Sequence, residues 1–226
     1  MKEYFIVAID GPAGAGKSTI ARLVAERLNF IYVDTGAMYR ALTLKAIREN
    51  VDLTDSTRLR TLMDKTNIDL QSSHGKNSLR VLLDNEEVTA EIRLPEITNK
   101  VFYIAQDASV RKKMVELQRR LAQKYKKAVL EGRDIGTVVF PKADVKIFLD
   151  AQVRERANRR FKELSEKGIN VVLEEIEQDI IERDRKDKTR EIGPLKQACD
   201  AVYVDSTNFS IEETVEKVTQ IIKNDL

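Results

Sequence analysis

Short apolar runs alternate with amphipathic helical segments along most of the chain. The runs have the length and composition of buried strands, and they lie at residues 5–9, 30–33, 128–130, 145–149 and 201–204. Between them apolar residues recur at helical spacing, and near the C-terminus such a helix follows a capping box of Ser210 and Glu213. Strands that alternate with helices predict an α/β fold with a doubly wound, five-stranded parallel sheet.

Two stretches depart from this alternation. Apolar and polar residues alternate at 67–70, 79–83 and 86–89, around turn-prone segments at 74–77 and 84–85. This pattern predicts a small antiparallel β insert, which we place at about residues 63–100. Residues 154–190 are helical in pattern and densely charged, which suits either a mobile element over a phosphate site or a solvated surface.

The composition excludes several kinds of catalysis. Among 226 residues, 39 are Lys or Arg and 37 are Asp or Glu, so the net charge of +2 creates no overall field that would attract nucleic acid or an anionic membrane. Cys199 is the only cysteine and His74 the only histidine, which excludes an internal disulfide, a Ser–His–Asp triad and a multi-histidine metal centre. Both residues are interpreted as structural, so the chemistry must use Lys, Arg, Asp, Glu and backbone amides.

No hydrophobic segment has the length of a membrane span or of a signal-peptide core with its cleavage site. We therefore expect a cytoplasmic protein that has no membrane and no nucleic acid as a partner.

A phosphate-binding loop follows the first strand. Residues 11–18 read Gly-Pro-Ala-Gly-Ala-Gly-Lys-Ser and match G-x-x-x-x-G-K-[ST] between a strand and a helix. Small residues let the backbone amides surround a phosphate, Lys17 can reach the β and γ phosphates, and Ser18 can hold Mg²⁺. The alternative is a glycine-rich turn with an incidental lysine, but such a turn would not need a strand directly before it and a helix directly after it.

Residues 34–40, Asp-Thr-Gly-Ala-Met-Tyr-Arg, follow the second strand. Thr35 is expected to cap a helix that carries Tyr39 and Arg40 on its first turns. The Arg40 guanidinium could bind an acceptor phosphate through two hydrogen bonds. A capped surface helix with a solvated arginine is the alternative.

Charged residues also follow the apolar run at 128–130. Glu131, Arg133 and Asp134 would lie at the carboxyl end of a central strand, where buried charges need partners. Glu131 could bind a Mg²⁺ ion through its waters, Arg133 a phosphate, and Asp134 a nucleobase amino group. An ion pair of Arg133 with either acid is the alternative.

Arg183, Asp187 and Arg190 are spaced so that they would share one face of a continuous helix. Asp187 could bind a sugar hydroxyl and the arginines a phosphate. A surface salt-bridge ladder is equally compatible with this spacing.

These segments together resemble the bacterial cytidylate kinase family. The resemblance extends from about residue 7 to the C-terminal helix, and it rests on residues 11–19, 34–40, 131–141, 146–151 and 182–190. Its most specific part is the string Gly-Arg-Asp-Ile-Gly-Thr-Val-Val-Phe-Pro, which begins at Gly132.

The resemblance implies one P-loop NTPase domain with three parts. These are a core at about 1–62, 101–150 and 185–226, an acceptor-binding antiparallel insert at about 63–100, and a helical lid at about 151–184. It further implies a monomer that transfers the γ-phosphoryl group of ATP to CMP or dCMP with Mg²⁺.

The resemblance also implies roles for individual residues. ATP would be bound by Gly11, Pro12, Ala13, Gly14, Ala15, Gly16, Lys17, Ser18 and Thr19. The acceptor would be bound by Asp34, Thr35, Tyr39, Arg40, Arg111, Arg133, Asp134, Arg183, Asp187 and Arg190. Transfer would be promoted by Lys17, Arg133, Arg156 and Arg160, and Mg²⁺ would be held by Ser18 with Glu131 acting through water.

Within that acceptor set, the resemblance places Arg40 and Arg133 at the phosphate. It places Arg111, Asp134 and Arg190 near the cytosine, and Arg183 with Asp187 near the ribose.

Two departures from the family pattern bear on the choice of base. Phe102 follows Val101 where the family often has serine, and residues 108–109 replace a proline that is common shortly before Arg111. A hydrogen bond to the base could therefore be missing, which leaves the preference among CMP, dCMP and UMP open.

Two other functions share part of the pattern. A kinase of AMP, UMP or another small acceptor would share the P-loop and residues 34–40, but Asp134 and the β insert argue against it. A regulatory NTPase would need a guanine-recognition motif such as Asn-Lys-x-Asp, which the strand ends at 148–150 and 204–206 lack.

Overall fold

The main sheet has five parallel strands in the order β2-β6-β1-β7-β8. The computed structural model describes residues 4–72, 79–166 and 168–226. The strands are β1 (Phe5–Asp10), β2 (Ile31–Asp34), β6 (Lys127–Gly132), β7 (Val145–Asp150) and β8 (Val202–Asp205). Each lies almost where an apolar run predicts it, so the prediction of a five-stranded parallel sheet is confirmed.

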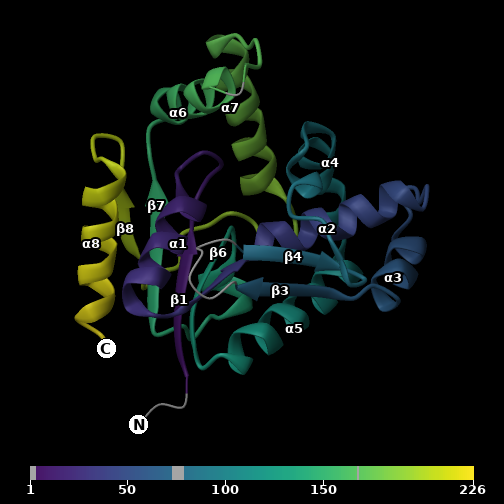
Figure 1. Ribbon diagram of the computed structural model, residues 1–226, viewed down its shortest axis with the longest axis horizontal. Helices are drawn as coiled ribbons and strands as arrows, with labels where there is room; N and C mark the ends of the chain where they lie inside the picture. The colour runs from purple at the N-terminus through teal and green to yellow at the C-terminus, as the bar shows by residue number, and fades with distance from the viewer. Residues whose placement is uncertain (1–3, 73–78, 167) are drawn as a thin grey trace.

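Helices cover both faces of this sheet (Figure 1). On one face lie α1 (Lys17–Leu28) and α8 (Ile211–Lys223), and on the other lie α2 (Thr35–Arg48), α3 (Ser56–Asp64), α4 (Pro95–Gln106) and α5 (Ala108–Lys124). Side chains alternate along a strand, so each strand contributes to the hydrophobic core on both faces of the sheet. Val7 of β1 packs with α1 and α8, and Ala8 packs on the face of α2 to α5. Ser210 and Glu213 form the predicted capping box at the start of α8.

The β insert is a three-stranded antiparallel sheet in the order β3-β4-β5. Its strands are β3 (Ile68–Ser72), β4 (Leu79–Leu83) and β5 (Glu86–Glu87). Asp84 and Asn85 form the tight turn between β4 and β5, both with positive φ, as a two-residue hairpin of this type requires. The predicted turn at 74–77, which contains His74, lies outside the described residues.

Short helical segments link the insert and the strands. They are η1 (Glu91–Arg93), which leads from the small sheet into α4, and η2 (Ile135–Val139), a π-helical turn that follows β6.

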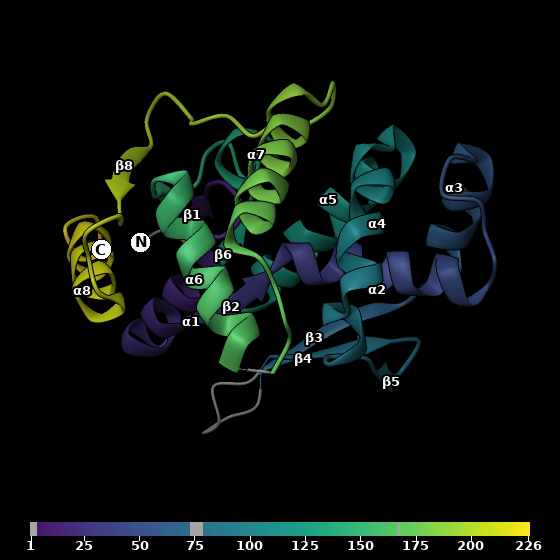
Figure 2. The same ribbon diagram turned by 90° about the horizontal axis from the view of Figure 1, so that it is seen from above.

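Two helices lie together above the carboxyl ends of the main strands (Figures 1 and 2). They are α6 (Val153–Glu166) and α7 (Leu173–Thr189), and they have a small core of their own around Ala157, Ile176 and Ile180. This pair forms the helical lid that the charged segment at 154–190 suggests, and it covers the edge of the sheet where ligands bind in folds of this class.

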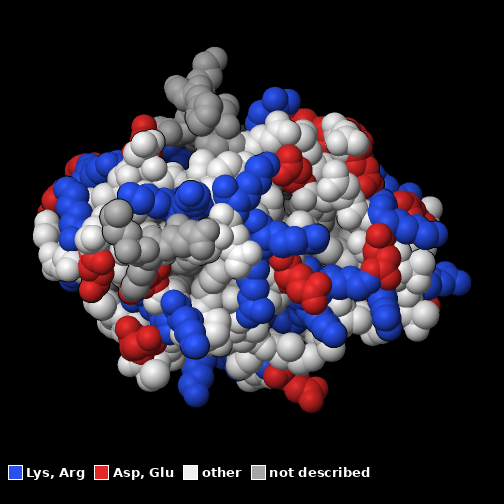
Figure 3. Space-filling view, turned by 90° about the horizontal axis from the view of Figure 1, so that it is seen from below, with Lys and Arg blue, Asp and Glu red and all other residues white. Residues whose placement is uncertain are grey.

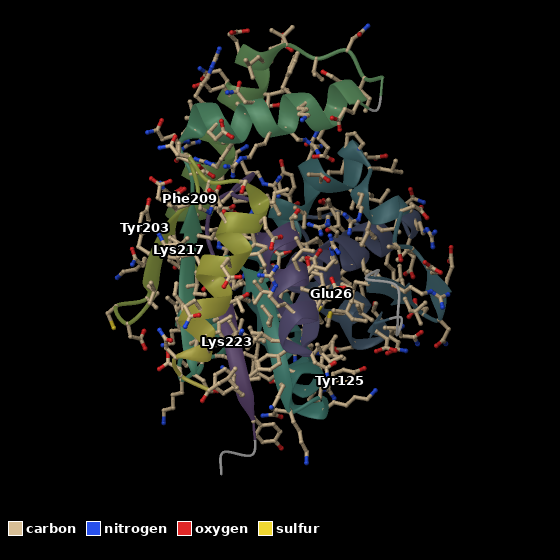
Figure 4. All side chains as sticks on the ribbon, turned by 60° about the vertical axis from the view of Figure 1, so that its left-hand side comes forward. Glu26, Tyr125, Tyr203, Phe209, Lys217 and Lys223 are labelled. Carbon is tan, nitrogen blue, oxygen red and sulfur yellow. The ribbon has the colours of Figure 1, made fainter. Side chains whose placement is uncertain are left out.

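The remaining surface shows mixed charges and a few aromatic side chains. On the face opposite the lid, Lys and Arg are interspersed with Asp and Glu (Figure 3). At the edge strand β8, half-exposed Tyr203 stacks on Phe148 at 6.2 Å, and Lys217 of α8 lies 4.9 Å from the Phe209 ring (Figure 4). Within the described ranges, none of the helices combines the length and hydrophobicity that crossing a membrane would require.

Candidate active site

Acidic residues meet at the carboxyl edge of the sheet because of the strand register. Asp34 of β2 pairs with Glu131 of β6, and Asp10 of β1 pairs with Gly132. All three carboxylates are buried. The lid and the loops after these strands enclose this edge, so the charges lie where solvent is largely excluded.

The phosphate-binding loop joins β1 to α1, and its glycines are required by its shape. Gly11 has φ 154°, and a Cβ there would overlap the carbonyl oxygen of Leu149 in β7. Gly14 and Gly16 have φ of 76° and 87°, in the left-handed region that favours glycine. The backbone is therefore shaped as an anion-binding loop that opens at the N-terminus of α1.

Lys17 begins α1 and is buried, with its ammonium nitrogen donating to the Pro12 carbonyl oxygen at 2.7 Å. Burial, and secondly the positive charge of Arg133, lower the pKa of Lys17 to about 7, against the opposing effect of Glu131. A bound polyphosphate would oppose both effects and raise the pKa of Lys17, because it would supply negative charge beside the ammonium group.

Glu131 is the centre of a hydrogen-bond cluster next to the loop. Its Oε1 accepts from the Ser18 hydroxyl and, at 2.9 Å, from the Tyr32 hydroxyl. Burial raises the pKa of Glu131, and the neighbouring charge of Asp34 adds to the effect. The ion pair of Arg133 with Glu131 that the sequence left as an alternative is replaced by these contacts.

The cap of α2 differs from the prediction. Asp34, not Thr35, is the N-cap residue, and its carboxylate accepts from the Ala37 amide at 2.7 Å. The Thr35 hydroxyl instead donates to the Glu131 carbonyl oxygen at 2.7 Å. The prediction that Thr35 caps the helix is therefore wrong, because pairing of β2 with β6 places its side chain against the neighbouring strand.

Asp134 is the centre of a second buried cluster. It forms an ion pair with Arg111 of α5, and Arg190 Nη2 lies 3.6 Å from its other oxygen. Tyr39 of α2 lies beneath the Arg111 guanidinium, 5.6 Å from ring centroid to Cζ. Burial raises the pKa of Tyr39 to about 12, so its hydroxyl remains a neutral hydrogen-bond donor.

A group of guanidinium side chains lies between this cluster and the phosphate-binding loop. Arg133 Nε donates to one Asp187 oxygen at 2.7 Å, and Arg190 Nη1 lies 4.0 Å from the other, so Asp187 of α7 pairs both with the β6 side of the site and with its neighbour along the chain. Burial, and then the charge of Arg133, lower the pKa of Arg183 to about 10, and Arg40 also contributes. Arg190 is the C-cap of α7, just past the last helical residue. The excess of positive charge suits a phosphate dianion.

Several donors in these clusters are buried and have no hydrogen-bond partner in the part of the chain that the structure describes. They are Tyr39 Oη, Arg40 Nε, Arg111 Nε and Arg190 Nη2. Buried polar groups are almost always paired in folded proteins. The donors on Tyr39, Arg111 and Arg190 lie around Asp134, and the Arg40 side chain lies beside Asp34. Buried donors without a hydrogen-bond partner indicate a site for a polar, anionic ligand.

The lid places its arginines differently from one another. Arg156 of α6 is buried; its guanidinium donates to the Ala151 and Ala13 carbonyl oxygens at 2.8 and 2.7 Å and pairs with Asp184 of α7 at 2.7 Å. Asp184 in turn accepts from the Ala13 amide at 3.3 Å. Arg160 is exposed and pairs with Glu163 of its own helix at 2.7 Å.

No site role was predicted from the sequence for Asp10, Tyr32, Arg159 or Asp184. Arg159 donates to the Ser206 carbonyl oxygen at 2.6 Å and lies within 4 Å of where a Cβ on Gly16 would be. Asp184 could have been found, because it continues the apolar stripe of Ile176 and Ile180 at four-residue spacing, and a charge in such a stripe must have a buried partner.

The fold and the site define a class of protein. A P-loop at the end of β1, acidic residues beside it, two helices above it and a buried cluster of arginine side chains near it form the arrangement of a small-molecule kinase. Two solved structures share the fold at low identity. One is of a protein from Thermus thermophilus, with a TM-score of 0.52, 17% identity and coverage of 100% of this chain and 99% of that one. The other is of an uncharacterized protein from Eubacterium ventriosum, with a TM-score of 0.51, 11% identity and coverage of 97% and 98%.

Sequence comparison identifies the family within this class. The family model described as cytidylate kinase matches residues 7–224. A cytidylate kinase of Lactobacillus johnsonii is 51% identical over 217 residues, which cover 96% of this chain and 93% of the relative. A cytidylate kinase of Bacillus subtilis is 46% identical over 223 residues, which cover 99% and 98%. The chain belongs to the cytidylate kinase family.

Proposed function

We propose that this protein transfers the γ-phosphoryl group of ATP to CMP, and also to dCMP, and so releases ADP and the nucleoside diphosphate. The observation that carries the proposal is the set of buried donors without a hydrogen-bond partner, three of them on Tyr39, Arg111 and Arg190 around Asp134 and one on Arg40 beside Asp34. The 46–51% identity to curated cytidylate kinases supports CMP as the acceptor.

In this proposal the loop holds the donor phosphates. The backbone N–H groups of 11–19, apart from Pro12, which has none, surround the β phosphate. Lys17 leaves the Pro12 carbonyl oxygen to neutralise charge on the transferring group. Arg160 can turn toward the same phosphates at the cost of one exposed ion pair, whereas Arg156 acts on the loop through Ala13.

The acceptor lies across the site from the donor. Arg40 and Arg133 hold its phosphate, Arg183 and Asp187 hold its sugar, and Asp134 contacts the base; the side chains of Asp34, Thr35, Tyr39, Arg111 and Arg190 support these contacts. The acceptor phosphate is ionised near neutral pH, so no general base is needed and catalysis consists of positioning and charge neutralisation.

The residues beside the loop fit Mg²⁺. Ser18 and Glu131 offer hard oxygen atoms that are already hydrogen-bonded to each other. We propose that Ser18 holds the ion directly and Glu131 through water. A bound Mg²⁺ would neutralise charge on the donor phosphates.

We propose that the enzyme acts as a monomer. It would act in the cytoplasm, as a core, an acceptor-binding insert and a lid with the boundaries given above.

A coupled assay of ADP release tests the proposed function directly. The panel should contain CMP, dCMP, UMP and AMP at equal concentrations, with ATP as donor. We expect CMP and dCMP to be phosphorylated fastest. Faster phosphorylation of AMP would contradict the assignment.

Replacement of Asp134 by asparagine should weaken the preference for CMP over UMP. The carboxylate can accept from the cytosine amino group, but it would face a uracil oxygen with no proton to share. An unpaired buried group costs about 1–3 kcal/mol, or roughly tenfold to a hundredfold in kcat/KM. Phe102 of α4, whose ring centroid lies 5.9 Å from Nζ of Lys186 of α7, is the second residue that we propose influences the choice of base.

The measurement is the ratio of kcat/KM for CMP and UMP in the wild type and in Asp134→Asn. The amide can turn a donor toward the uracil oxygen, so the ratio should fall. An unchanged ratio would show that another residue selects the base. Lys188→Ala, on the exposed face of α7, is a control that should leave the ratio unchanged.

ATP binding should take up a proton at pH 8.5. Lys17 has a pKa of about 7 in the free protein, so it is largely neutral at this pH, and the triphosphate should raise that pKa. ATP affinity should therefore fall as the pH rises above about 7. Calorimetry in two buffers of different ionisation enthalpy measures the uptake, which Lys17→Met should abolish. Equal heats in both buffers would contradict the prediction.

A further inference from the structure

Asp10 forms a contact that bridges the donor and acceptor sides of the site. It is the last residue of β1, directly before the phosphate-binding loop, and it is 5% exposed. Its two oxygens accept from the backbone amides of Ile135 and Gly136, at 2.8 and 2.7 Å. Both amides belong to η2, the π-helical turn that follows β6.

These two amides are the first of η2, where an N-cap side chain from the same segment would ordinarily accept. The residue at that N-cap position is Asp134, and its side chain makes no cap hydrogen bond. Its carboxylate is directed to Arg111 and Arg190 instead. Because Asp10 satisfies the amides from the neighbouring strand, Asp134 is released for the acceptor pocket.

The backbone of η2 is closely packed by side chains of two strands. A Cβ on Gly136 would lie 3.4 Å from Asp10 Oδ2 and 3.2 Å from Cδ of Lys146, so the turn is held tightly between β1 and β7. Burial raises the pKa of Asp10 to about 6, partly offset by the two amides and by Lys17, while Asp134 adds to the rise. A buried carboxylate at this position is unfavourable by itself, which agrees with a role that requires its two hydrogen bonds.

We propose that Asp10 is a positioning residue for the acceptor, which caps η2 so that the Asp134 carboxylate faces the base. The proposal rests on the proposed function, because it assigns Asp10 to the monophosphate side of that same site. The competing role is support of the phosphate-binding loop, to which Asp10 is joined through Gly11. The two roles predict changes in different Michaelis constants.

Asp10→Asn tests the proposal because asparagine has the same shape and one fewer acceptor. Its amide group would meet one of the two backbone N–H groups, and the start of η2 should move. We expect KM for the acceptor to rise about fivefold or more, with a smaller CMP to UMP ratio, while KM for ATP changes less than about twofold. Gly136→Ala leaves Asp10 in place but crowds the start of η2, so it should also raise KM for the acceptor and lower the CMP to UMP ratio.

Ser210→Ala is the matched control, because it removes a helix cap from α8, remote from the acceptor, and should leave both Michaelis constants unchanged. The acceptor in these assays is the monophosphate that the wild type phosphorylates best. If that acceptor is not CMP, the proposed function fails in the wild type, and the role of Asp10 is still tested separately by the variants. If Asp10→Asn raises KM for ATP as much as KM for the acceptor, or changes neither, the positioning role is overturned. If the Asn variant does not fold, the same comparison of Michaelis constants in Gly136→Ala decides.

Discussion

Lys17→Ala should reduce kcat by roughly 10²- to 10³-fold, the loss seen when one preorganised transition-state contact is removed. In the free protein the Lys17 ammonium group donates to Pro12 and is buried beside Arg133. The phosphoryl group in transfer carries charge that, in the proposed role, this ammonium group neutralises, so its loss should act on the chemical step. Rates of ADP release at saturating ATP and acceptor measure the effect.

The fold should tolerate this change, because the alanine removes a charge and no core contact of α1. Thermal unfolding of the variant should therefore be cooperative, with a midpoint close to that of the wild type. Lys223→Ala, at the exposed end of α8 (Figure 4), is a matched lysine control and should retain full turnover. A Lys17→Ala enzyme with near wild-type kcat would refute the role assigned to Lys17.

Much of the fold could be predicted from the sequence because its signals are local. A buried parallel strand is apolar on both faces, so its run of hydrophobic residues is visible without knowledge of the partners. The phosphate-binding loop is equally local, since its glycines are required by backbone shape and by the approach of Leu149. The prediction of the loop thus depended on one contiguous segment.

The site was harder to predict because its partners come from distant segments. Arg133 pairs with Asp187, 54 residues away, and not with its neighbours Glu131 or Asp134. Thr35 and Asp34 are both good capping residues, and only the pairing of β2 with β6 decides between them. Strand register and helix docking therefore determine the charge partners, and neither can be predicted from the spacing of residues within one segment.

The Arg156–Asp184 pair should contribute most to holding the lid on the phosphate-binding loop. Both side chains are buried, at 4% and 9% exposure, and together they bind the carbonyl oxygen and the amide of Ala13. Removal of one member of a buried pair leaves the other charge without a partner, which costs about 3–5 kcal/mol. We expect Asp184→Leu to lower the free energy of unfolding by an amount of this order, measured by urea denaturation.

A double-mutant cycle distinguishes this pair from ordinary helix contacts. Arg156→Leu with Asp184→Leu removes both charges, so the double variant should be less destabilised than the sum of the two single variants. Arg154→Ala is the matched control on α6, because Arg154 is about half exposed and pairs with Glu177 on the surface, where such pairs contribute little. Hydrogen exchange should locate the loss in α6, α7 and the phosphate-binding loop. Strictly additive single effects would show that the two charges act independently and would contradict the prediction.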